Sequence, residues 1–176
     1  MSPRTKDARL SSEIQAHREA LDEFIGTSRS LPPDLWNAPR PGDKWSPAQI
    51  AEHLRLSYVA ASGELAGKGG LRMRTKRWQQ WFLRPLYLRP ILRQGRFPKT
   101  VPTIREIKPQ PASFDREELL AAFREEGEGF LRAVAEAPAR SRISHPFLGY
   151  LDLPDAVRFL AQHIRHHHGQ ILPKHS

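Results

Sequence analysis

The chain of 176 residues contains no cysteine, which excludes disulfide bonds and thiolate metal ligands. Any metal ion must therefore be held by histidine, carboxylate or main-chain oxygen ligands. The sequence has no run of about eighteen apolar residues, and its N-terminal "MSPRTKDARLSSE" lacks the apolar stretch of a secretory signal. We therefore expect a cytoplasmic protein, and the length predicts one domain over residues 1–176.

Acidic residues are absent between Glu64 and Arg105, where ten lysines and arginines lie. The formal net charge is +9, so removing these ten charges leaves about −1 for the rest of the chain. The basicity is thus local to an insertion over residues 67–112. Its stretch "RWQQWFLRPLYLRPILRQGR" interleaves arginine with aromatic and aliphatic residues, and Pro85 and Pro90 are expected to prevent one continuous helix.

We expect this basic insertion to form an amphipathic cover on the surface, beside the pocket of the candidate histidine site described below. Short helical pieces are expected between Trp78 and Leu92. The simplest interpretation is an insertion packed on the rest of the domain, with solvated arginines. Binding to an anionic membrane surface is a second interpretation. Nucleic acid is disfavoured because no recognition fold is visible. The sequence leaves a homodimer open.

Four segments have the apolar periodicity of helices, and they predict an all-α four-helix bundle. Ser46, Pro47 and Gln49 form a strong start signal for the second segment, because they supply a cap, a first-position proline and a capping box. Asp115 is expected to cap the third segment, and the fourth begins near Asp152. No strand pattern is convincing, and the proline-rich connection after the first segment should exclude a helix. The predicted helices cover residues 12–29, 46–66, 115–137 and 152–172.

Four of the eight histidines lie in "HIRHHHGQ", residues 163–170. Because a helix advances about 100° per residue, His163 and His167 share a face, whereas His166 and His168 point to either side of it. His167 also stands where the apolar stripe of the last helix calls for a core residue. A pair of imidazoles at this spacing is the usual helical way to grip a transition metal.

A third imidazole is offered by His53, which falls on the inward stripe of the second helix between Ile50 and Leu54. Three histidines from two facing helices would leave open positions for water and substrate, as catalytic metal sites do. A hydrogen-bonded core residue is the competing interpretation, and the commoner one for a lone inward histidine. His17, on the inward stripe of the first helix, is expected to be structural.

Together, "KWSPAQIAEHL" and "HIRHHHGQI" resemble the signature pair of the DinB-like, YfiT-type superfamily of metal-dependent enzymes. In that family a Trp-Ser/Thr-Pro helix start leads to one histidine, and a final helix carries His-x3-His followed by Gln. The resemblance spans residues 12–172, with the basic insertion the least typical part. It implies a bundle with one long crossover and a divalent metal, nickel or zinc, which is held by three histidines that map onto His53, His163 and His167. The iron-binding His-x3-His-x-Glu variant of ergothioneine-type sulfoxide synthases is disfavoured, because Gly169 stands at the Glu position.

The resemblance points to two kinds of reaction. One is transfer or isomerisation with a low-molecular-weight thiol such as mycothiol, bacillithiol or glutathione, and the other is hydrolysis; both would use the metal to lower the pKa of a bound thiol or water. We expect the thiol chemistry first, a metal-dependent hydrolase second, and a non-catalytic metal-binding protein as the competing class. Glu52 points about 100° away from His53 and is expected at the surface. Gln170 is a candidate hydrogen-bond partner of a ligand histidine or a pocket residue, with a capping or surface role as the equal alternative. His145 is a candidate for the pocket mouth, although an ordinary turn residue is the favoured interpretation.

Overall fold

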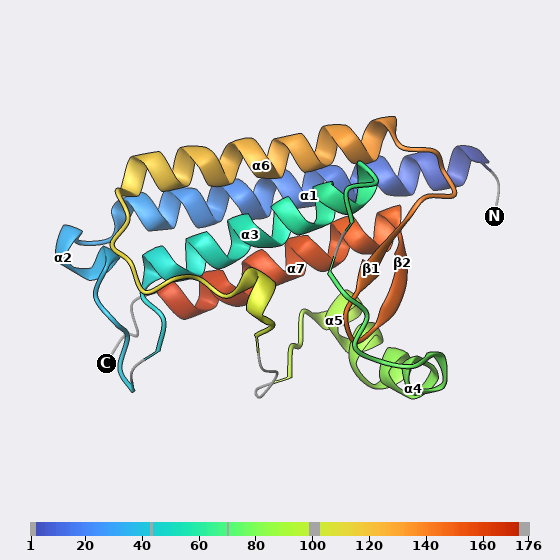
Figure 1. The fold of residues 1–176 in the computed structure, drawn as a ribbon. Helices are drawn as coiled ribbons and strands as arrows, with labels where there is room; N and C mark the ends of the chain where they lie inside the picture. The colour runs from blue at the N-terminus through green and yellow to red at the C-terminus, as the bar shows by residue number, and fades with distance from the viewer. Residues whose placement is uncertain (1–2, 43, 70, 99–102, 173–176) are drawn as a thin grey trace.

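The computed structural model describes residues 3–42, 44–69, 71–98 and 103–172 (Figure 1). Helices α1 and α7 pack side by side, as do α3 and α6. In Figure 1, α3 and α6 run in the same direction, so the chain returns along the bundle between them. The predicted all-α bundle with one long crossover is therefore confirmed. Its four long helices are α1 (Pro3–Ser30), α3 (Pro47–Leu65), α6 (Arg116–Glu136) and α7 (Leu153–Ile171).

Side-chain caps fix the starts of three of these helices. The Ser46 hydroxyl accepts a hydrogen bond from the Gln49 N–H at 3.1 Å, and the Gln49 side chain accepts one from the Ser46 N–H at 3.0 Å. Asp115 and Asp152 each accept a bond at 2.9 Å from the backbone N–H three residues further on. The predicted starts of α3, α6 and α7 thus agree with the structure to within one residue.

Helix α1 begins at Pro3, well before the predicted start at Ser12. The added turns pack beside α7, where Arg9 forms an ion pair with Asp155 and Leu10 contacts the core. The predicted helix began at Ser12 because serine is a common N-cap residue, but contacts with α7 carry the helix through this position.

The proline-rich connection contains a short helix, α2 (Pro33–Trp36), where we expected none. Pro33 occupies the first helical position, at which a missing N–H breaks no intrahelical hydrogen bond. Trp36 is buried, and its indole N–H donates to the carbonyl oxygen of Phe114 at 3.0 Å. The short helix therefore covers one end of the bundle.

A two-stranded antiparallel hairpin, β1 (Arg142–His145) and β2 (Gly149–Asp152), precedes α7 and was not predicted. Strands of four residues are too short to give a clear alternation of apolar and polar positions. Gly149 has a φ of 80°, which a residue with a side chain adopts rarely. The buried side chains that join the hairpin to the core are Ile143, Leu148 and Leu151.

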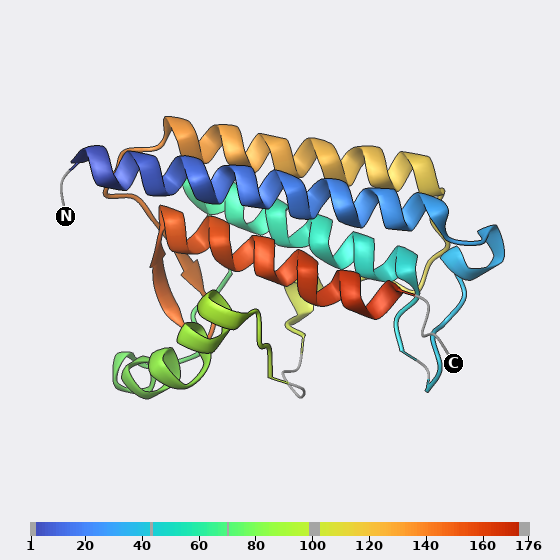
Figure 2. The same cartoon turned by 180° about the vertical axis from the view of Figure 1, so that it is seen from behind.

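The basic insertion folds beside the hairpin and α7, on one side of the bundle (Figures 1 and 2). The expectation that Pro85 and Pro90 prevent one continuous helix was wrong, because α4, a π-helical turn and α5 follow one another without a gap. Pro85 lies in the π-helical turn, whose wider hydrogen bonding accommodates it, and Pro90 lies near the start of α5. Leu88 and Ile91 are buried, so the insertion is a cover packed on the domain. None of the described helices is long and apolar enough to cross a membrane. The elements of the insertion are α4 (Arg77–Leu83), the π-helical turn η1 (Arg84–Leu88), α5 (Arg89–Gln94) and the 3-10 turn η2 (Arg105–Ile107).

Candidate metal centre

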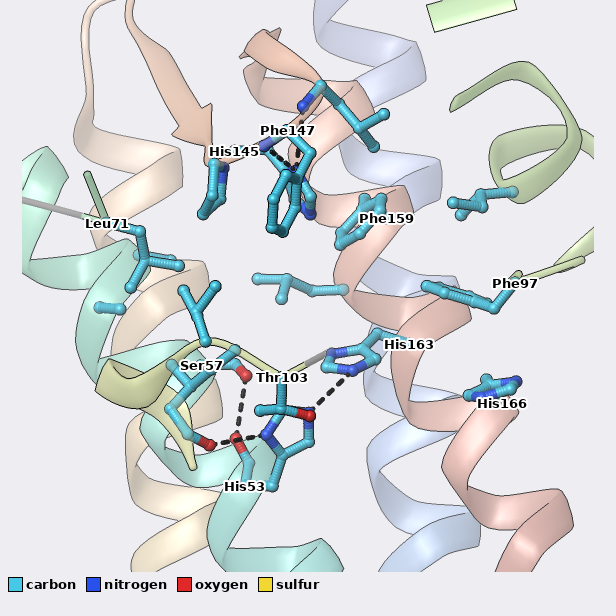
Figure 3. Close-up of a pocket in the computed structure, with 18 of the residues that line it drawn as sticks. His53, Ser57, Leu71, Phe97, Thr103, His145, Phe147, Phe159, His163 and His166 are labelled. Carbon is cyan, nitrogen blue, oxygen red and sulfur yellow. Dashed lines mark hydrogen bonds between the residues drawn. The ribbon is translucent and has the colours of Figure 1, made fainter. Parts of the chain in front are cut away.

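Three histidines from two neighbouring helices meet beside a cavity. His53 on α3 and His163 on α7 point towards each other in Figure 3, with 3.2 Å between their Nε2 atoms. The Nε2 of His167, one turn further along α7, lies 3.1 Å from that of His163. One nitrogen from each ring can be chosen so that all three lie within 4.8 Å of one another. The structure thus brings together the three histidines that the sequence analysis singled out, in a group that could hold a metal ion.

Hydrogen bonds to the outer nitrogens fix the tautomers of two of these rings. His53 Nδ1 donates to the carbonyl oxygen of Ile107 at 2.8 Å, and His167 Nδ1 donates to Oε1 of Gln170 at 3.1 Å. Each of these rings, when neutral, therefore presents an unprotonated Nε2 to the centre of the group. His163 can supply at most one proton there, which can bond only one of its two neighbours. A cation among the three nitrogens would satisfy all of their lone pairs.

Burial keeps the three rings neutral. It lowers the pKa of His167 to about 3, and the nearby His53, His166 and Arg40 act in the same direction. Burial also lowers the pKa of His53, and it lowers that of His163 well below 6.5. Neutral imidazole is the form that binds metal ions, so the group is ready to bind one at neutral pH.

Gln170 joins the three-histidine group to the rest of the site. Its Oε1 accepts hydrogen bonds from His167 Nδ1 and, at 3.3 Å, from Arg40, while its Nε2 donates to His166 Nε2 at 3.0 Å. Arg40 also donates to the carbonyl oxygen of Trp45 at 2.7 Å. Since Arg40 can only donate, its contact sets the orientation of the Gln170 amide and hence the tautomer of His167. Gln170 is therefore a hydrogen-bond partner of a candidate ligand rather than a free surface residue.

The other histidines of α7 have different surroundings. His168 points away from the group, as predicted, and its Nε2 lies 2.7 Å from Oγ1 of Thr27 on α1. His166 lines the cavity and stacks on Phe97, with 4.8 Å between the ring centroids. Helix geometry alone had placed His166 outside the inward face; the insertion, which carries Phe97, encloses it.

A cavity of about 800 Å³ adjoins the three histidines. Glu64 is the one carboxylate in its described lining, and both of its oxygens accept hydrogen bonds from Ser144, at 2.9 Å from the N–H and 2.7 Å from the hydroxyl. Arg40 and Lys44 also line the cavity. The wall is otherwise mainly apolar and comes from α3, α7, the hairpin and the insertion; it includes Leu71, Leu83, Ile91, Phe97, Phe147 and Phe159.

His145, at the end of β1, lines the same cavity (Figure 3). Its Nδ1 accepts hydrogen bonds from the N–H groups of Phe147 and Leu148 at 3.3 and 3.2 Å, so the neutral ring carries its proton on Nε2. Burial lowers the pKa of His145 to about 4. The ring packs against Phe159 with 4.9 Å between centroids. His145, for which the sequence favoured an ordinary turn role over the pocket mouth, is therefore a neutral hydrogen-bond donor in the cavity wall.

The expectation that Glu52 lies at the surface was wrong. Its side chain is nearly buried and forms an ion pair with Arg55 at 2.7 Å. It takes no part in the three-histidine group.

Comparison with known proteins agrees with this geometry. A family model described as the DinB superfamily matches residues 14–171, which include both histidine motifs. No curated protein and no solved structure matches significantly. A match over most of the chain, together with a three-histidine group that fits a divalent metal ion, identifies the family: the chain belongs to the DinB superfamily.

Proposed function

We propose that the protein is a metal-dependent enzyme that holds a divalent ion, zinc or nickel, through the Nε2 atoms of His53, His163 and His167. The observation that supports this is the convergence of three neutral ring nitrogens, two of them without a proton. Imidazole suits both metals. Three protein ligands are the number found in catalytic zinc sites, which keep a further position for substrate, whereas structural sites use four.

The proposed reaction is a transfer or isomerisation that uses a low-molecular-weight thiol. A divalent ion held by neutral imidazoles lowers the pKa of a thiol or water that reaches it, and so supplies a nucleophile near neutral pH. Because the chain has no cysteine, the thiol would come with a cosubstrate such as mycothiol, bacillithiol or glutathione. These thiols carry carboxylates. Arg40 and Lys44 in the lining, with Glu64 already engaged by Ser144, favour such an anionic cosubstrate.

In this proposal the chain's own groups orient the reactants and exclude water. The Ile107 carbonyl and the Gln170 amide hold the rings of His53 and His167 in their metal-binding tautomers. The apolar wall takes up the non-polar part of the substrate. His145 donates its Nε2 proton in a hydrogen bond to the bound molecule.

Metal reconstitution tests the proposal. Untagged protein, stripped of metal and reloaded with zinc or nickel, is assayed with the three thiols and an electrophilic acceptor. We expect thiol-dependent turnover that chelation abolishes and one of the two metals restores. His163→Ala should lose the activity, and its matched control on the same helix, His168→Ala, should keep it. Metal-dependent hydrolysis of esters or amides without thiol would support the hydrolase instead, and metal binding without turnover of either kind would support a non-catalytic protein.

A further inference from the structure

The cover has an outer face of large apolar side chains that nothing in the described chain covers. Trp78, Trp81, Phe82 and Leu86 are 64%, 74%, 56% and 62% exposed. Their spacing of three, four and eight residues from Trp78 places them along one face of α4 and η1. The rings of Trp81 and Phe82 contact each other edge to face, with centroids 4.7 Å apart. Single exposed apolar residues are ordinary, but a contiguous group of this size marks an interaction surface.

Unpaired positive charge flanks this apolar face along the chain. Residues 65–104 contain no acid. Among the described residues of the insertion before Arg105, only Arg74 forms an ion pair, with Glu106 at 3.2 Å. Exposed tryptophan beside basic residues is the composition of helices that lie in a membrane interface. The exposed basic residues in the described part of this stretch are Lys68, Arg72, Arg74, Lys76, Arg77, Arg89, Arg93 and Arg96.

The apolar face is presented by a folded scaffold. The N–H of Arg74 donates to the carbonyl oxygen of Pro146 at 2.7 Å, and the Arg84 guanidinium donates to that of Tyr150 at 2.8 Å. On the inner side, Leu88 is buried in the core. In Figure 1, α4 lies at the edge of the molecule, on the side opposite α6. The exposed rings are therefore held at the periphery by the hairpin, where a flat surface can reach them.

We propose that the outer face of α4 and η1 is a docking surface for an anionic lipid bilayer. Indole rings favour the boundary between headgroups and acyl chains, and arginines reach lipid phosphates while their aliphatic stems stay in apolar surroundings. A second copy of the chain fits less well, because a two-fold contact would bring the same cationic segments together. Nucleic acid would engage the arginines but leave the aliphatic Leu86 uncovered. This proposal does not depend on the reaction at the metal centre.

Docking there would bring the bilayer next to the cavity. Leu83 and Ile91, from the same helical run, line the cavity wall, so one side of the run faces the cavity and the other would face lipid. Apolar or amphipathic molecules dissolved in the bilayer would then have a short path to the three-histidine group.

Vesicle sedimentation of the full-length, untagged protein tests the proposal. We expect the protein to sediment with phosphatidylcholine vesicles that contain phosphatidylglycerol but not with phosphatidylcholine alone, and to be released by salt. Binding should shift the tryptophan emission to shorter wavelength. Trp78→Ala/Trp81→Ala should weaken binding about tenfold or more, whereas Leu35→Ala/Leu172→Ala, which removes exposed apolar residues elsewhere, should not.

A second pair of variants separates local charge from net charge. Since each basic residue near an anionic surface contributes about fivefold, Arg77→Gln/Arg93→Gln should weaken binding about 25-fold. Arg132→Gln/Arg140→Gln has the same net charge, and its two exposed arginines lie outside the insertion, so it should bind like the parent. Circular dichroism confirms that each variant is folded.

Three results would overturn the proposal. Absence of binding to both vesicle types at low salt is the first. Equal weakening by the two arginine pairs is the second, because binding would then follow net charge alone. The third is that the parent protein binds no vesicles but forms a dimer, or binds DNA in a salt-sensitive way, and that the variants of the insertion lose this property. Loss of the dimer would assign the face to a second copy of the chain, and loss of DNA binding would assign it to nucleic acid.

Discussion

Two histidines in the core, His17 on α1 and His53 on α3, look alike in sequence and differ in their surroundings. Both lie on inward apolar stripes and both are buried, with exposures of 0% and 4%. The Nε2 of His17 lies 2.7 Å from the hydroxyl of Tyr58, whereas that of His53 lies 3.2 Å from the Nε2 of His163 on α7, beside the unprotonated Nε2 of His167. Periodicity identifies a buried histidine, but only its neighbours tell whether its lone pair is already used.

In the His17 region the Nε2 lone pair or proton is already used by a neutral partner. Burial raises the pKa of Tyr58 well above 10 and lowers that of His17 to about 3, so a neutral phenol meets a neutral imidazole. One hydrogen bond satisfies both Nε2 and the hydroxyl, while Nδ1 of His17 is buried without a hydrogen-bond partner. Among the described residues His17 belongs to no group of three ligand side chains that could hold a metal ion. In the His53 region, by contrast, three Nε2 atoms converge and at most one of them carries a proton. This excess of unpaired acceptors is what distinguishes a candidate metal centre from a core hydrogen bond.

Removal of a proposed ligand should change metal binding most, and removal of His17 should not change it. Replacing His53, His163 or His167 by Ala should lower metal affinity by more than about 100-fold, because two imidazoles hold a divalent ion weakly. His17→Gln should leave the metal content unchanged. Plasma mass spectrometry of untagged proteins measures the metal per chain.

The matched controls for the ligand variants are on the same helix. His166→Ala and His168→Ala should change the metal content little. If either of them empties the site while His53→Ala retains the metal, the ligand assignment is wrong.

Acidification should destabilise the metal-free protein by way of its buried neutral histidines. The pKa of His17 is about 3 in the folded chain and 6.5 ordinarily, so between these values the unfolded chain binds a proton that the folded chain does not. The contribution of the neutral His17 to the unfolding free energy is complete above about pH 6.5. As the pH falls towards 3, the unfolding free energy decreases by about 1.4 kcal/mol per pH unit for each such histidine. His17→Gln should flatten the pH profile of the unfolding free energy by about one such slope. Urea unfolding across this range measures it, and an unchanged slope would show that His17 is not held neutral.

Gln170 should have an intermediate effect on metal binding. Gln170→Leu removes the acceptor that orients the His167 ring, and such partners of metal ligands typically change affinity by about 10- to 100-fold. The exposed Gln15→Leu on α1 is the matched control. Competition with a metal-chelating dye gives both affinities; equal values would mean that the tautomer of His167 does not depend on Gln170.

Tyr58→Phe should have the smallest effect. It removes one buried hydrogen bond to His17, which costs about 1 kcal/mol of unfolding free energy. The metal content should be that of the parent protein. A fall in metal content would show that the His17 and His53 regions are coupled through α3.

Much of the fold follows from local signals. The caps at Ser46 and Asp115 and the helical stripes depend on residues within a few turns, so the starts of α3 and α6 were predictable. The early start of α1 and the hairpin before α7 were not, because they depend on contacts between distant segments such as Arg9 with Asp155. The short helix α2 was missed because proline was treated as a breaker, although it is compatible with a helix start.

The site likewise has features that local sequence predicts and features that depend on distant contacts. Helical register predicted that His163 and His167 share a face and that His53 points inward, and the structure brings them together; that they hold a metal stays a prediction. The hydrogen bond from His53 to the carbonyl of Ile107 could not have been found, because a main-chain acceptor has no sequence signature. The enclosure of His166 depends on the path of an insertion that has no simple periodicity.

Helix α3 carries one candidate metal ligand and also sets a distance along the cavity wall. His53 lies near its start and Glu64, which anchors Ser144 of the hairpin, lies near its end, and both line the cavity. At a rise of about 1.5 Å per residue, the eleven helical steps from His53 to Glu64 span about 16 Å. One rigid helix thus sets the distance between the candidate metal ligand and Glu64. If the protein acts as proposed, this distance would select substrates by length, and shortening α3 by one turn between the two residues would change the accepted length by about four methylene groups.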